Sequence, residues 1–324
     1  MVKRLDNVDR AKGMLIILAV IGHIWQAGYI HNVIYSFHMP AFFAISGMLM
    51  RHTRSYEKSV QNFFLSRLYA FGIPFLFFEI LGILTDIMRH GMTLNINGYL
   101  YNTLTLQYND SNMWFLADLF LIEIIFTAVK KLLKKDWAVG ILCVLLFVLS
   151  LLVTDAKNRY VQEFVSAGHY LFFFAAGFWG KEFFQKKHAV LTVVACLIPP
   201  LTALLFGKRA DWSLSFANTA FLISGIAGAY AVLQLCGQTI PDKLNSLLTA
   251  AGRNSIIIYG THHIIYAAVG VLVGNTDFTA TPLWAGILML LVVAATEVPT
   301  IYVINRWLPF LAGKRKQKQT ALHN

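Results

Sequence analysis

Residues 137–154 read WAVGILCVLLFVLSLLVT, a run of 18 residues without one charged side chain. A helix of about 20 mostly apolar residues crosses the hydrocarbon core of a bilayer, so this run predicts a transmembrane helix. Nine further apolar runs predict further spans. They cover residues 13–30, 33–50, 68–88, 112–130, 166–184, 189–206, 212–236, 254–273 and 281–303. The chain is therefore predicted to be all-α, a polytopic transmembrane bundle of about ten spans.

The composition supports the same class. Of the 324 residues, 57% are hydrophobic and only 13% are charged, whereas soluble domains carry about 25% charged residues. In a soluble protein the net charge of +11 would suggest binding to nucleic acid. Here the cations lie between apolar runs, so the membrane topology of the chain accounts for them. No nucleic-acid partner is therefore predicted. The three cysteines form no CxxC pair, so neither a disulfide framework nor a zinc site is implied.

The distribution of Lys and Arg predicts the orientation. If the N-terminus is cytoplasmic, 22 of the 27 basic residues fall in cytoplasmic segments. The outer loops then hold Arg89, Lys157, Arg159, Lys208 and Arg209. This bias predicts an even number of spans with both termini in the cytoplasm. The first apolar run lacks a small-residue cleavage site and is expected to be retained. Residues 1–313 form one membrane domain, and residues 314–324 form a basic cytoplasmic tail.

Ionisable residues inside spans are costly and usually face a cavity or a partner. His23 lies about ten residues into the predicted first span, near mid-bilayer. Lys12 precedes it by eleven residues, which at 100° per residue places both on one face of a helix, about 16 Å apart. Lys12 and His23 would then form one stripe along the helix, which fits a ligand with a charged head and a long thin arm. The head would meet Lys12 and the reactive end would meet His23, whose imidazole is suited to proton abstraction. A histidine packed between helices and an ordinary cytoplasmic lysine fit the pattern equally well.

Other histidines and carboxylates have structural alternatives. His38 precedes the helix-distorting Pro40 and is expected to pack at a kink. His262 and His263 are adjacent and point about 100° apart, so we expect one to face the bundle and the two not to share a metal ion. Glu79, Asp118, Glu123 and Glu297 are expected to form structural pairs. No nucleotide-binding glycine motif, HExxH or hydrolase GxSxG occurs.

Five short motifs, in chain order, resemble the acyltransferase-3 family of integral membrane acyltransferases. They are NVDRAKG at 7–13 followed by Gly22-His23, FHMPAFFAISG at 37–47, the basic Arg67 ahead of Pro74, WFL at 114–116, and GRNS at 252–255 continuing through Tyr259 to His262. Lys12 and His23 match the family's basic residue followed, after ten residues, by His. One departure is that Ala70 stands where the family often has the second Arg of Arg-x-x-Arg. Without an added soluble domain, the chain looks most similar to the fucose 4-O-acetylase-like branch.

The resemblance implies a membrane-bound O-acyltransferase, with residues 1–313 as its acyltransferase domain. It would move an acetyl or other acyl group from cytoplasmic acyl-CoA to a hydroxyl of a carbohydrate or cell-envelope glycan, in the cytoplasmic membrane of a bacterium. Acetyl-CoA would be a co-substrate, with no permanently bound cofactor and no metal. The implied catalytic residues are His23, the general base, His38 and His262. The implied donor-binding residues are Arg10, Lys12 and Arg67, and the implied acceptor-binding residues are Trp114, Asn254 and Tyr259.

Two other functions compete with this one. Histidine and glutamate residues inside the membrane also suit a proton-coupled transporter or flippase of a carbohydrate or lipid-linked intermediate. Against a transporter, the sequence shows no paired repeat of interrupted helices. A structural or sensory membrane subunit would explain the hydrophobicity but not the stripe of Lys12 and His23. The sequence predicts no oligomeric state.

Overall fold

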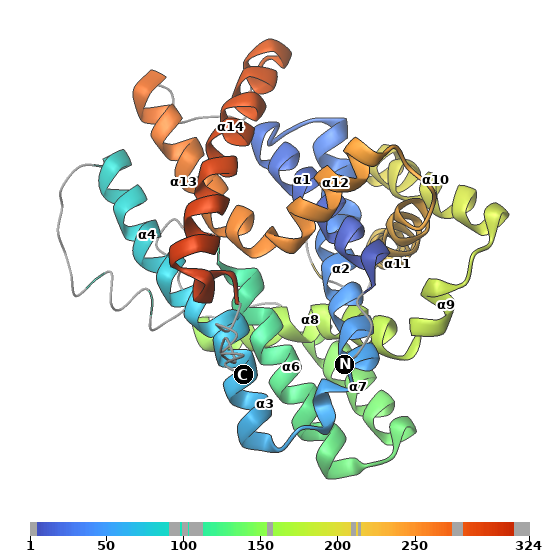
Figure 1. Cartoon of the computed structure of the whole chain (residues 1–324). Coiled ribbons are helices and arrows are strands. Elements are labelled where there is room, and N and C mark those ends of the chain that lie inside the picture. The colour runs from blue at the N-terminus through green and yellow to red at the C-terminus, as the bar shows by residue number, and fades with distance from the viewer. Residues whose placement is uncertain are drawn as a thin grey trace, which may run out of the picture.

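The computed structural model describes residues 5–90, 98, 103, 113–153, 158–208, 212, 215–273 and 281–313, and these residues form helices and no strand (Figure 1). Each predicted span overlaps a helix. The long helices are α1 (Asp6–Ile24), α2 (Tyr29–Thr53), α4 (Ile73–His90), α6 (Trp114–Leu133), α7 (Asp136–Leu152), α8 (Arg159–Trp179), α10 (Ala189–Phe206), α11 (Phe216–Cys236), α13 (Ser255–Val273) and α14 (Leu283–Trp307). The prediction of an all-α protein is thereby confirmed.

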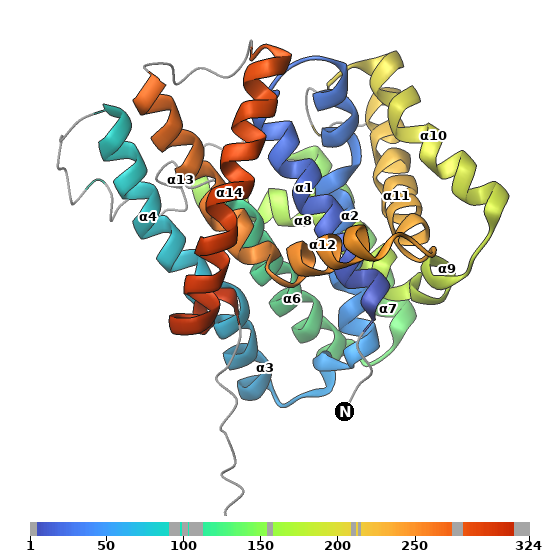
Figure 2. The same ribbon diagram turned by 45° about the horizontal axis from the view of Figure 1, so that its top comes forward.

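Shorter elements connect these helices. They are the 3₁₀ turn Ser55–Glu57, α3 (Val60–Arg67), the π-helical turn Leu68–Gly72, α9 (Lys181–Gln185), α12 (Asp242–Arg253) and the 3₁₀ turn Pro309–Ala312. Figure 2 shows α12 lying across α1 and leading into α13. In the described residues, six helical segments are long and apolar enough to cross a membrane: 29–53, 60–87, 189–206, 216–236, 255–273 and 283–307. The chain is thus a multi-pass membrane protein, while ten spans and cytoplasmic termini remain predictions.

The predicted first span, 13–30, is wrong at both ends. The helix begins at Asp6 and ends at Ile24, because the chain turns at Trp25 and α2 begins at Tyr29 after Gly28 with a φ of 91°. His23 therefore stands in the last turn of α1 rather than halfway along a span. The polar residues Asp6 to Lys12 belong to the first helix, which hydropathy alone does not reveal.

Helix α2 lies at the centre of the bundle and contacts α1, α8, α10 and α11. Where α2 meets α8, glycines let the two backbones touch. A Cβ atom built on Gly47 would lie 1.9 Å from the Phe174 carbonyl oxygen, and one on Gly177 would lie 1.8 Å from the Ala44 carbonyl oxygen. Small residues at such crossings are a typical basis of helix association in membranes, where lipid tails remove the usual hydrophobic driving force.

Helix α1 packs against α12 in the same way. A Cβ atom on Gly13 would lie 1.9 Å from the Leu248 carbonyl oxygen, and one on Gly252 would lie 1.7 Å from the Asp9 carbonyl oxygen. Arg253 reinforces this crossing by an ion pair to Asp9 at 3.3 Å. The crossing joins the first and fifth family-like motifs and brings the start of α13 close to Lys12.

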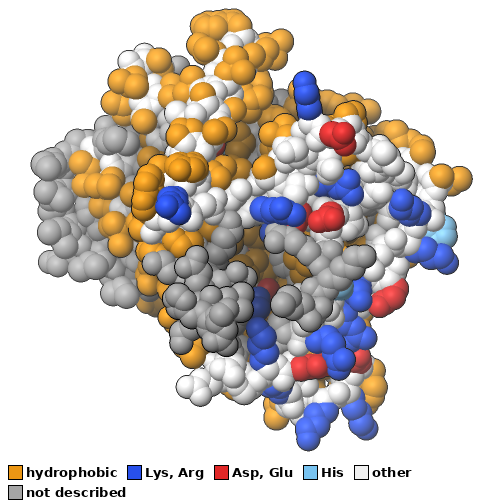
Figure 3. Space-filling view, in the orientation of Figure 1, with side chains coloured by type: hydrophobic (Ala, Val, Ile, Leu, Met, Phe, Trp, Pro, Cys, Tyr) orange, Lys and Arg blue, Asp and Glu red, His pale blue; other side chains and the backbone are white. Residues whose placement is uncertain are grey.

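Several predicted cytoplasmic segments meet one another. Lys130 pairs with Asp136, Arg51 lies 3.7 Å from Asp136, and Lys131 donates a hydrogen bond to the Lys58 carbonyl. On the face shown in Figure 3, basic side chains gather over α1 and α12 and near the ends of α2 and α6, whereas mostly hydrophobic side chains cover α13 and α14. The ends of α2, α6 and α7 thus lie on one side of the protein.

Candidate active site

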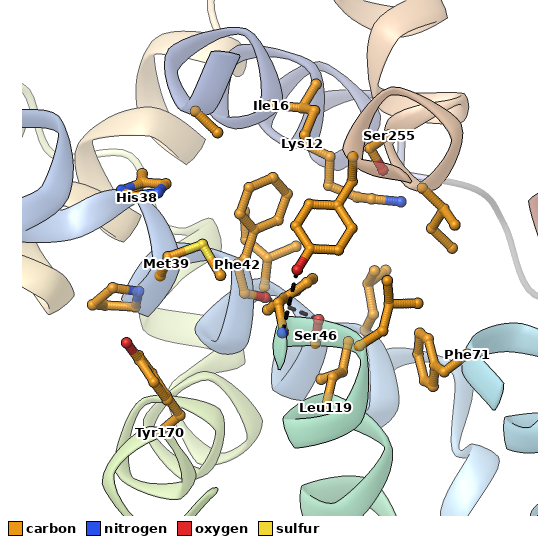
Figure 4. A pocket seen from close by; sticks show the side chains of 18 of the residues that line it. Lys12, Ile16, His38, Met39, Phe42, Ser46, Phe71, Leu119, Tyr170 and Ser255 are labelled. Carbon is orange, nitrogen blue, oxygen red and sulfur yellow. Dashed lines mark hydrogen bonds between the residues drawn. The ribbon is translucent and has the colours of Figure 1, made fainter. Parts of the chain in front are cut away.

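A cavity of about 400 Å³ opens between α1, α2, α6, α8 and α13. Figure 4 shows Lys12 and Ile16 on one wall and Leu119 and Tyr170 on the opposite wall. Polar residues line the cavity near Thr53 and Arg67 and again near His23 and His38, with Met39, Phe42 and other apolar side chains between. Along α2, His38 and Thr53 are fifteen residues apart, which corresponds to about 22 Å. The cavity is therefore long, with a cationic end and an imidazole end.

The predicted stripe on α1 faces this cavity. Lys12, Ile16, Ala19 and His23 all line it. Their spacing of four, three and four residues follows one face of an α-helix. The prediction that Lys12 and His23 share a face is confirmed, because the helix begins early enough to include Lys12.

At the imidazole end, Tyr35 contacts His23. The Tyr35 hydroxyl lies 3.3 Å from Nδ1 of His23, and the Tyr35 ring lies 4.7 Å from the ring of His38, measured between centroids. The sequence analysis did not single out Tyr35. Its position three residues before His38, on the same face of one helix, is the signal that could have identified it.

His262 lies in the same end of the cavity and is fully buried. Its Nδ1 donates a hydrogen bond to the Ile258 carbonyl oxygen at 2.8 Å. A carbonyl oxygen only accepts, so the neutral ring carries its proton on Nδ1 and a lone pair on Nε2. His38 makes the same kind of bond, from Nδ1 to the Ile34 carbonyl oxygen at 2.9 Å. The structure thus brings the three predicted catalytic histidines to one place.

As expected, only one of the two adjacent histidines, His262, is fully buried and faces the cavity, but the two rings do not diverge. Their ring centroids lie 4.2 Å apart. The ring centroid of His23 lies 5.2 Å from that of His262 and 4.4 Å from that of His263. The 100° between adjacent residues separates their Cα–Cβ bonds, but each imidazole is long enough to turn toward a third ring that approaches from another helix. The geometric reason for expecting no shared metal ion therefore does not hold.

At the cationic end, Arg67 forms an ion pair with Glu123, with a distance of 2.7 Å between Nη1 and Oε2. Both residues line the cavity, as does Lys12. The guanidinium also lies 5.1 Å from the Phe63 ring centroid and 5.9 Å from that of Phe71. Glu123 thus forms the pair expected of it and offsets the charge of Arg67.

Two predicted site residues do not line the cavity. Arg10 points toward α12, where its Nη1 donates to Asn245 at 3.4 Å. Asn254 donates to the Ala250 carbonyl oxygen at 2.8 Å and accepts from Asn305 at 2.8 Å. Asn254 therefore connects the α12–α13 junction to α14, and the direct binding roles expected of both residues find no support in this geometry.

Trp114 and Tyr259 do line the cavity and belong to two linked motifs. The backbone N–H of Phe115 donates to the Tyr259 hydroxyl oxygen at 3.3 Å. The Trp114 ring lies 5.4 Å from the ring of Tyr170, between centroids. Aromatic rings of this kind suit contact with the apolar faces of a sugar or with the arm of a cofactor.

Comparison with known proteins gives one match. A family model described as an acyltransferase domain, that of the acyltransferase-3 family, matches residues 5–299. This range includes every residue that lines the cavity. No curated protein and no solved structure matches the chain.

Proposed function

The chain belongs to the acyltransferase-3 family, and on that premise we propose that it transfers an acetyl group from cytoplasmic acetyl-CoA to a hydroxyl of a carbohydrate or cell-envelope glycan. The observation that carries the proposal is the single cavity that joins Lys12 and Arg67 at one end to His23 and His262 at the other. Its length suits a donor whose phosphates bind at the cationic end while a thin arm carries the thioester to the imidazoles.

In this proposal His23 is the general base. With Nδ1 donating to the Tyr35 hydroxyl oxygen, Nε2 of His23 carries the lone pair that takes the proton of the acceptor hydroxyl. The acceptor oxygen then forms a C–O bond to the acyl carbon, and the C–S bond of the thioester breaks. The proton on His23 passes to the departing thiolate, which leaves as the free thiol of coenzyme A. His38 and His262 line the same cavity as His23 and complete the proposed catalytic group.

The acceptor belongs to the sugar class in the proposal, as in the fucose 4-O-acetylase-like branch. Support comes from Trp114 and Tyr259, which line the cavity with aromatic rings. The Tyr259 ring lies 6.3 Å from the ring of His262, between centroids, and so offers a stacking surface beside the imidazole end. The proposed location is the cytoplasmic membrane of a bacterium, with the donor side facing the cytoplasm.

The direct test uses purified protein in detergent, acetyl-CoA labelled in its acetyl group, and a panel of glycan acceptors. Transfer of label with release of free coenzyme A supports the proposal. A transporter, the alternative suggested by the buried histidines and glutamates, would instead move solute across liposomes that contain no acyl-CoA. Solute flux without any label transfer to the panel would overturn the proposal.

Replacing Lys12 tests the cationic end. Lys12→Ala is expected to raise the KM for acetyl-CoA about tenfold or more while kcat changes little, because a charge-assisted hydrogen bond to phosphate contributes about 1.5–3 kcal/mol. The measurement is initial rate against donor concentration. Lys243→Ala is the control, because Lys243 is exposed on α12, which packs beside α1, and does not line the cavity. Equal KM values for the two variants would remove Lys12 from the donor site.

A further inference from the structure

Three imidazoles from two helices converge beside the cavity. His23 comes from the end of α1, and His262 and His263 come from α13. One ring nitrogen from each lies within 4.8 Å of the other two. Either a shared hydrogen-bond network or a bound cation can bring three such rings together. The hydrogen bonds that His262 makes favour the bound cation.

Nε2 of His262 has no hydrogen-bond partner among the described residues, although the side chain is fully buried. Leaving a buried acceptor unsatisfied costs about 1–3 kcal/mol. Because the Ile258 carbonyl oxygen accepts a hydrogen bond from Nδ1, the proton is on Nδ1 and Nε2 carries a lone pair that points in a fixed direction. Metal-binding histidines typically have this arrangement, in which the second ring nitrogen donates to a backbone carbonyl. His262 is therefore oriented as a ligand.

The ring of His23 is held in a comparable way. The Tyr35 hydroxyl lies 3.3 Å from its Nδ1, which leaves Nε2 as its second ring nitrogen. Tyr266 encloses the cluster from the other side, with its ring centroid 5.5 Å from His262 and 5.9 Å from His263. His23 and His262 also line the cavity, so an ion in the cavity can reach them.

We infer that His23, His262 and His263 form a binding site for one divalent transition-metal ion of the zinc class. Three neutral imidazoles select zinc, cobalt, nickel or copper, whereas Mg²⁺ and Ca²⁺ require oxygen ligands. Zn–N bonds of about 2.0–2.1 Å place tetrahedral nitrogen ligands about 3.4 Å apart. Rotation of the half-buried His23 and His263 side chains closes the remaining separation. Three protein ligands would leave the fourth tetrahedral position to water.

Metal binding has a consequence for transfer. The ion takes the lone pair of His23 in a dative bond, and a nitrogen bound to metal accepts no proton from a hydroxyl. Occupation of the site therefore inhibits transfer. This consequence, unlike the metal site itself, rests on the proposed function. His263 does not line the cavity, so it provides a ligand that can be changed without altering the proposed catalytic group.

The test uses Co²⁺ as the probe, because tetrahedral Co²⁺ absorbs strongly in the visible range. The full chain, purified in detergent and stripped with chelator, is dialysed against Co²⁺, and its spectrum and metal content are measured. We expect one Co²⁺ per chain with tetrahedral bands. His263→Ala is expected to lose these bands, while His263→Cys is expected to retain Co²⁺ and add a thiolate-to-cobalt band in the near ultraviolet.

His188→Ala serves as the control for adventitious binding, since His188 is exposed at the start of α10 and remote in sequence from the cluster. An unchanged Co²⁺ spectrum in His263→Ala, or no stoichiometric binding to the unmodified chain, would overturn the site. In a transfer assay, Zn²⁺ is expected to inhibit the unmodified chain and to leave His263→Ala active. Full turnover with Zn²⁺ bound would contradict the predicted inhibition but not the metal site. If the chain had no transferase activity, the Co²⁺ spectrum would still show whether the metal site exists.

Discussion

His23→Gln is expected to lower acyl transfer by about 10²- to 10⁴-fold while the protein remains folded. Glutamine keeps much of the volume of the imidazole and can still hydrogen-bond to Tyr35, but it cannot take a proton from the acceptor hydroxyl. Proton transfer by a positioned side chain contributes a factor of this size to many enzymes. The measurement is single-turnover transfer of labelled acetyl, which separates the chemical step from product release.

His169→Gln is the matched control. His169 is a buried histidine within α8, and its Nε2 bonds to the Ser150 carbonyl oxygen at 3.0 Å, but it does not line the cavity. Its replacement is expected to reduce stability and to leave transfer per folded molecule nearly unchanged. If His23→Gln turned over at the rate of the unmodified chain, His23 would not be the base, and His262, with its fixed lone pair, would be the next candidate.

Gly177→Ala is expected to destabilise the bundle more than any conservative surface change. The added Cβ atom would lie 1.8 Å from the Ala44 carbonyl oxygen, and neither partner is the end of a flexible side chain. Helices α2 and α8 must move apart by about 1 Å or more, which loosens a close-packed crossing. Overpacking of this kind costs about 1–3 kcal/mol, and occasionally more. The measurement is the midpoint of thermal unfolding in detergent.

Gly140→Ala is the control on the neighbouring helix α7. A Cβ atom there meets only the Trp179 ring, at 3.9 Å, which is an ordinary contact. Alanine also favours the helix over glycine by about 1 kcal/mol, so this variant is expected to be neutral or slightly more stable. Equal unfolding midpoints for Gly177→Ala and Gly140→Ala would show that the close approach of α2 and α8 is not required.

The apolar runs predicted the helices well because burial in a bilayer depends on the length and composition of a local segment. The run at 189–206, for example, coincides with α10. The prediction was weakest at 13–30, where polar residues open α1 and a turn at Trp25 interrupts the run. Hydropathy averages over such a turn, and it assigns no helix to a polar segment such as Asp6 to Lys12.

The spacing of Lys12 and His23 along one helix was enough to predict that both face the same space, since residues eleven apart on a helix differ by only about 20°. The same argument failed for His262 and His263, because the direction of two adjacent side chains depends on what approaches them. Arg67 could be identified as a cation near the cavity, but its pairing with Glu123, 56 positions away, could not.

The sequence by itself determined that the chain is a helical membrane protein, to which family it belongs, and which face of the first helix carries the reactive side chains. These properties depend on short segments and their order. Only the tertiary structure decided that Tyr35 holds His23, that Arg10 and Asn254 face away from the cavity, and that three histidines meet. Those outcomes depend on how closely helices distant in sequence approach, which the glycines at 13, 47, 177 and 252 permit.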